Sequence, residues 1–90
     1  MSFDLEIHLS RREGALLRAL GVVQRRGWVV RELHARHQGS GEMSLALCVV
    51  GERGACQVLV RQLARLPEVL AVGCPGADGV QWVRARAPVS

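Results

Sequence analysis

The chain has 90 residues with a formal net charge of +4, and 49% of its residues are hydrophobic. It is therefore long enough for one small domain and too apolar to stay disordered. No apolar run approaches the ~18 residues that span a bilayer, and the first residues lack the basic start and apolar core of a signal peptide. These features predict a single cytoplasmic domain over residues 1–90, without a membrane partner.

A strand and a helix are the first expected elements. Residues 3–9 alternate between apolar and polar side chains, the pattern of a strand with one buried face. From Glu13 to Arg26, apolar residues recur at helical spacing. Ser10 and Glu13 have the spacing of a capping box, yet a helix that starts at Gly14 is equally compatible with the sequence.

The other expected elements, in chain order, are a strand over 28–37, a strand over 43–50, a helix over 55–66, a strand over 69–74, and a short extra edge strand or tail over 80–85. The strand over 43–50 has few polar residues on either face, which is typical of the middle of a sheet. The strand over 28–37 changes phase, which predicts a bulge near Arg31 and Glu32. In the second helix, the residues expected to face inward are Val58, Leu59, Leu63 and Leu66.

The two halves of the chain repeat at an offset of 40 residues. Gly14-Ala15 recurs as Gly54-Ala55, and each half reads strand, glycine, helix, strand. Two such units predict an α+β fold of the ferredoxin-like βαββαβ type, in which an antiparallel sheet carries both helices on one face. We expect its core over residues 3–74, with 75–90 as the extra strand or tail.

No pattern in the sequence indicates catalysis, a metal site or nucleic acid binding. The histidines and cysteines lack the CxxC or HxxxH spacing of metal ligands, and there is no GxSxG motif. The strands expected at the centre of the sheet carry no aromatic residue that could stack on a base, and Asp4 and Glu6 would repel phosphate. We therefore expect a binding domain without catalytic residues, metal or cofactor of its own.

Two segments resemble a known family. Residues 14–33, GALLRALGVVQRRGWVVREL, combine a loop glycine, an apolar helix, an Arg-Gly-aromatic triplet and a strand, and residues 62–70, QLARLPEVL, follow. This pattern resembles the ACT domain of acetolactate synthase regulatory (small) subunits, and most of all the short, single-domain subunit of the isozyme II type. The resemblance covers roughly residues 5–74, and its most specific part is Gly27-Trp28.

The resemblance implies a noncatalytic regulatory subunit. Such a subunit binds and activates the catalytic (large) subunit of acetolactate synthase in branched-chain amino-acid biosynthesis. Thiamine diphosphate, Mg and FAD would then be bound by the large subunit and not by this chain. The alternative is a free-standing, homodimeric ACT domain that senses an amino acid and regulates another protein.

An effector site is also implied by the resemblance. By position, the residues that would contact a branched-chain amino acid at a dimer interface are Arg11, Gly14, Ala15 and Val30. Arg11 stands where effector-binding members have an asparagine. An arginine is bulkier and only donates hydrogen bonds, so we expect a weak response to valine or none.

The strand over 28–37 is expected at the edge of the sheet. It contains no proline or lysine that would discourage pairing with another edge. We therefore expect a homodimer with one eight-stranded sheet, in which the candidate edge residues are Trp28, Val30, Leu33 and Ala35. The helix-free face of the sheet is expected to be covered in the working complex, and its residues include His8, Ser44, Ala46, Cys48 and Val50.

Overall fold

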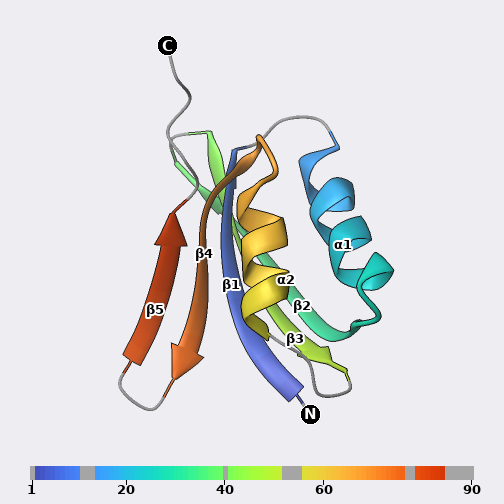
Figure 1. Ribbon diagram of the computed structural model, residues 1–90. Helices are drawn as coiled ribbons and strands as arrows, with labels where there is room; N and C mark the ends of the chain where they lie inside the picture. The colour runs from blue at the N-terminus through green and yellow to red at the C-terminus, as the bar shows by residue number, and fades with distance from the viewer. Residues whose placement is uncertain (1, 11–13, 40, 52–55, 77–78, 85–90) are drawn as a thin grey trace.

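The computed structural model describes residues 2–10, 14–39, 41–51, 56–76 and 79–84. Its elements are β1 (Ser2–Ser10), α1 (Ala15–Arg25), β2 (Val29–Gln38), β3 (Glu42–Val50), α2 (Cys56–Ala64), β4 (Val69–Gly76) and β5 (Gly79–Arg84). The strands form one antiparallel sheet in the order β2-β3-β1-β4-β5, and both helices lie on one face of it (Figure 1). The predicted βαββαβ fold is confirmed, and the segment after β4 is a fifth strand.

The core lies between the helices and the central strands. In β1, alternate residues face the helices because side chains of a strand point to opposite faces in turn, and Leu5, Ile7 and Leu9 are at most 2% exposed. The matching face of β3 is equally buried, with Leu45 opposite Ile7 and Leu47 opposite Leu5. The helices complete the core with Ala15, Ala19, Val22, Val23, Leu59, Val60 and Leu63. No helix in the described part of the chain is long and apolar enough to cross a membrane.

The start of α1 distinguishes the two alternatives left open by the sequence. Ser10 is the last residue of β1, and α1 begins at Ala15 with Gly14 as its N-cap. Gly14 has a φ of 79°, a left-handed conformation that glycine adopts without strain. The capping box at Ser10 is therefore wrong, and the start at Gly14 is confirmed.

The inward face of α2 differs from the prediction at one position. Leu59 and Leu63 are buried as expected, but Val60 is 6% exposed whereas Val58 is 43% exposed. Because three apolar residues follow one another at 58–60, the sequence allows two adjacent stripes on this helix. Packing against the sheet selects the stripe that contains Val60.

The bulge in β2 and the packing of the residue just before this strand are two further features of the fold. The register between β2 and β3 shifts between Val30 and Glu32, which confirms the bulge. Trp28 is 7% exposed, and its ring meets Phe3 edge-on, with centroids 5.4 Å apart. A Cβ at Gly51 would lie 2.5 Å from Cε3 of this ring, so only a glycine lets Trp28 close the core here.

Candidate functional site

The N-terminal end of α1 contains two of the candidate effector residues. Gly14 turns the chain into the helix, and its carbonyl accepts the N–H of Arg18 at 3.0 Å. Ala15 is 4% exposed, so it shapes the site by its small size. Arg11 lies outside the described residues. Within the described chain no side chain caps α1, which leaves backbone amides at this end as donors for an anion.

An ion pair between the two halves of the chain lies beside Gly14. The Nε of Arg18 donates to Oε1 of Glu68 at 2.5 Å. A Cβ at Gly14 would be only 3.0 Å from a terminal guanidinium nitrogen of Arg18, so the guanidinium covers the start of the helix. The absence of a side chain at Gly14 thus permits this close approach.

Glu68 is buried where the chain enters β4. The residue is 5% exposed, and its carbonyl accepts the N–H of Ser10 at 2.8 Å. Its second carboxylate oxygen, Oε2, has no hydrogen-bond partner among the described residues. Sequence reasoning missed this residue. The 40-residue repeat could have indicated that Glu68 is buried, because Glu68 is equivalent to Trp28, which lies in the core.

Val30 lies far from the other candidate effector residues within one molecule. Gly14 comes directly before the first residue of α1. Val30 comes after the end of α1 at Arg25, and it is the second residue of β2. The 11 residues of α1 separate the two positions by about 16 Å, and Figure 1 shows β2 starting at the opposite end of α1 from Gly14. One copy of the chain therefore does not bring Val30 together with Gly14 and Ala15.

The candidate edge residues divide into two groups. Trp28 packs in the core just before β2 and presents little surface to a partner. Val30 is half-buried, whereas Leu33 is 38% exposed and Ala35 is also exposed. Among the described strands, β2 pairs only with β3, so one of its edges is open as predicted.

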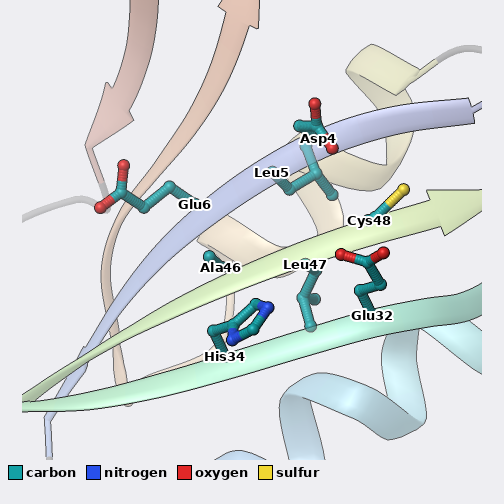
Figure 2. A pocket seen from close by; sticks show the side chains of 8 residues that line it. All are labelled: Asp4, Leu5, Glu6, Glu32, His34, Ala46, Leu47 and Cys48. Carbon is teal, nitrogen blue, oxygen red and sulfur yellow. The ribbon is translucent and has the colours of Figure 1, made fainter.

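Polar side chains from three strands gather on the helix-free face. Figure 2 shows Asp4 and Glu6 on β1, Ala46 and Cys48 on β3, and Glu32 and His34 on β2. These residues line a shallow hollow of ≈ 180 Å³. The face is thus hollowed at its centre, where Ala46 is exposed to solvent.

The register orders these side chains into three rows across the strands. One row contains Asp4, Cys48 and Glu32, the next contains Glu6, Ala46 and His34, and the last contains His8, Ser44 and Arg36. Formal charge therefore changes from negative to positive along the strands. Oε1 of Glu6 accepts a hydrogen bond from Oγ of Ser44 at 3.1 Å and lies 3.5 Å from Nε2 of His8, which ties the middle row to the last.

The chemistry of this face does not favour catalysis. Burial raises the pKa of the Cys48 thiol above its ordinary value, and the carboxylates of Asp4 and Glu32 raise it further. Cys48 is therefore a protonated thiol near neutral pH and a poor nucleophile. Within the described part of the chain, no group of three histidine, cysteine or acidic residues could hold a metal ion.

Comparison with known proteins identifies the family. The model of the ACT domain matches residues 11–72, and the chain belongs to the ACT domain family. ACT domains are regulatory, noncatalytic modules, so a regulatory role follows and the chain is not an enzyme by itself. No curated protein is significantly similar to the chain.

Solved structures share the fold. One of them is the solution structure of the C-terminal domain of the MgtC protein from Mycobacterium tuberculosis, with a TM-score of 0.64 and 16% sequence identity. The match covers 96% of this chain and 92% of that chain. At this identity the likeness concerns the fold alone.

Proposed function

We propose that this chain is the regulatory subunit of an acetolactate synthase, and that it binds and activates the catalytic subunit. The ACT family match over residues 11–72 supports the regulatory role. The motif over residues 14–33 supports the specific enzyme. It corresponds to one continuous unit of the structure, in which Gly14 starts α1, Gly27 turns the chain with a φ of 85°, and Trp28 anchors β2 in the core.

In this proposal the reaction chemistry belongs to the partner. Thiamine diphosphate, Mg and FAD are bound by the catalytic subunit, and this chain acts through contact. The helix-free face supports such contact, because β3 exposes Ala46 in a hollow surrounded by Asp4, Glu6 and Glu32. We also place the protein in the cytoplasm, where Cys48 and Cys74 would stay reduced.

The second candidate is a free-standing homodimeric ACT domain that senses an amino acid. The end of α1 favours it, since backbone amides beside Gly14 suit a carboxylate and the open edge of β2 suits a second copy. In this candidate the dimer regulates a protein other than acetolactate synthase, and a branched-chain amino acid is the first effector to test.

Reconstitution with a catalytic subunit tests the first candidate. The tagged chain should retain the acetolactate synthase large subunit of its own organism, and addition of the chain should raise the specific activity of that subunit several-fold. As a control, Arg61→Glu reverses the charge at an exposed site of α2 and should keep the activation. The proposal would be contradicted if the unmodified chain neither retained the large subunit nor raised its specific activity.

Calorimetry separates the second candidate from the first. Valine, leucine and isoleucine are titrated into the isolated chain and into the reconstituted enzyme. Binding to the isolated dimer, together with no retention of the large subunit, would support the free-standing sensor. We expect weak inhibition of the reconstituted enzyme by valine or none, because Arg11 stands where effector-binding members have an asparagine.

A further inference from the structure

We propose that a hollow between α1 and α2 binds the phosphate group of a small phosphate monoester. The two helices lie side by side on the sheet and run in opposite directions, so the last turn of α1 packs along α2 (Figure 1). This inter-helix hollow lies at the opposite end of α1 from Gly14, and it is separate from the helix-free face. The proposal therefore goes beyond the proposed function and does not depend on which enzyme the chain regulates.

Four described residues line the inter-helix hollow, which has a volume of ≈ 260 Å³. They are Val22 and Arg25 of α1, Arg26 at its C-cap, and Gln62 of α2. The first three have the i, i+3, i+4 spacing that places side chains on one side of a helix. Val22 is 8% exposed and lies deepest, whereas both arginines are exposed and Gln62 is half-buried. The hollow thus combines an apolar base with two guanidinium groups and one carboxamide.

The end of α1 does not need these arginines as caps. Arginines in the last turn of a helix ordinarily offset the partial negative charge of its last carbonyls. Here backbone amides bond to these carbonyls, because the N–H of Trp28 donates to Val23 at 3.2 Å and the N–H of Gly27 donates to Gln24 at 3.0 Å. Gly27 has a φ of 85°, which permits this closure. The guanidinium groups therefore remain available to a ligand.

One of the two guanidinium groups is already oriented. The Nε of Arg25 donates to the carbonyl of Gly21 at 3.3 Å. Among the described residues, its terminal nitrogens, Nη1 and Nη2, have no hydrogen-bond partner. A guanidinium that is held through Nε presents its two terminal nitrogens as a pair of donors, which is an arrangement that binds two oxygens of a phosphate.

The positive charge at the inter-helix hollow is not balanced within the described part of the chain. Neither Arg25 nor Arg26 forms an ion pair with a described carboxylate, and the buried carboxylate of Glu68 already pairs with Arg18. Two guanidinium groups at one hollow repel each other, and an anion between them offsets this repulsion. Two positive charges without a partner favour a ligand with a charge near −2 over a zwitterion such as an amino acid.

A phosphate monoester fits these groups better than a carboxylate does. Its phosphate carries a charge of about −1.5 to −2 at pH 7 and has three acceptor oxygens. The donors of Arg25, Arg26 and Gln62 come from two helices and can each meet one of these oxygens, whereas a carboxylate has two oxygens in one plane. Because ≈ 260 Å³ lies below the volume of about 300–1,000 Å³ that holds drug-sized ligands, a small ester is favoured over a nucleotide.

Titration followed by NMR tests the site in the unmodified chain. The labelled protein is titrated with glycerol 3-phosphate, inorganic phosphate and succinate, at an ionic strength kept constant with chloride. Glycerol 3-phosphate should bind with a dissociation constant of about 1 mM, inorganic phosphate no more tightly, and succinate about tenfold more weakly. The side-chain amide of Gln62 and the Nε–H signals of Arg25 and Arg26 should shift together, and the Nε–H signal of Arg61 should not.

Neutral substitutions identify the residues that bind the phosphate. Arg25→Gln and Arg26→Gln should each weaken the binding of glycerol 3-phosphate about tenfold. Arg61→Gln is the matched control, because it removes the same charge from an exposed position of α2 that does not line the inter-helix hollow. This control should change the affinity less than about twofold. All three side chains are exposed, so the backbone amide signals of the sheet should stay where they are and verify an intact fold.

Three results would overturn the proposal. A lack of binding at about 50 mM glycerol 3-phosphate would contradict the site itself. Equal losses of affinity in Arg25→Gln and Arg61→Gln would show a diffuse attraction to a basic surface and not a site in the hollow. Binding of succinate or inorganic phosphate more tightly than glycerol 3-phosphate would contradict the ligand class. None of these results bears on activation of acetolactate synthase, which reconstitution measures separately.

Discussion

The second strand of each half of the chain has different surroundings. β2 leaves residues 31–37 exposed and pairs with one described strand, whereas β4 lies between β1 and β5 and buries Val69 and Val72 almost completely. The difference arises from β5, which covers the edge that β4 would otherwise present (Figure 1). A repeated plan thus gives one strand that builds the core and one that is available to another chain.

The same comparison holds for the residues just before these strands. Trp28 and Glu68 are 40 residues apart, and both are buried, at 7% and 5% exposure. Trp28 fills space against Phe3 and Gly51, whereas Glu68 holds Arg18 beside Gly14. The same position of the repeat therefore packs in the core in the first half, as Trp28, and forms an ion pair between the two halves in the second, as Glu68.

The largest expected effect concerns Trp28. Trp28→Ala removes a buried aromatic side chain and leaves a cavity, so the free energy of unfolding should fall by about 3–5 kcal/mol. Urea denaturation followed by circular dichroism measures the loss. A loss below about 1 kcal/mol would mean that Trp28 contributes little to the core.

A matched pair of valines compares β4 with β2 directly. Val72→Ala in β4 removes two buried methyl groups from a residue at 0% exposure and should cost about 2 kcal/mol of the free energy of unfolding. Val29→Ala in β2, where the residue is 63% exposed, should cost less than about 0.5 kcal/mol. Equal losses in urea denaturation would contradict the contrast between the two strands.

A smaller effect is expected at Glu68. Glu68→Gln keeps the shape but removes the charge that pairs with Arg18, whose side chain is half exposed, so the loss should be about 1 kcal/mol. Arg25→Gln is the control, because Arg25 lies on the same helix and bonds only to the carbonyl of Gly21 in the described structure. A loss no larger for Glu68→Gln than for Arg25→Gln would show that the ion pair does not stabilise the fold.

Local patterns in the sequence predict most of this fold. The strand alternation and the bulge near Arg31 follow from the spacing of apolar residues, and the edge position of β2 follows from the topology that the repeat predicts. The structure confirms the bulge and the edge position. The choice between Val58 and Val60 does not follow, because three consecutive apolar residues fit two helix faces equally well. Only packing against the sheet decides between them.

The candidate site depends more on contacts between distant residues. Arg18 and Glu68 are 50 residues apart, and neither stands in a motif that indicates the other. The sequence allowed two starts for α1. Ser10 could cap the helix through its side chain, or it could end the strand and leave the helix to start at Gly14, as it does in the structure. The resemblance places Val30 beside Gly14 and Ala15, whereas in one copy Val30 lies at the opposite end of α1 from them.

Hydrogen exchange of β2 in the isolated chain tests the central claim, that this strand pairs with a second copy. Alternate amides of residues 32–36 point away from β3 and gain hydrogen bonds only in the dimer. We predict that they are protected at high protein concentration and lose protection on dilution, while amides of β4 stay protected throughout. Rapid exchange of the outward amides of β2 at every concentration would contradict the account.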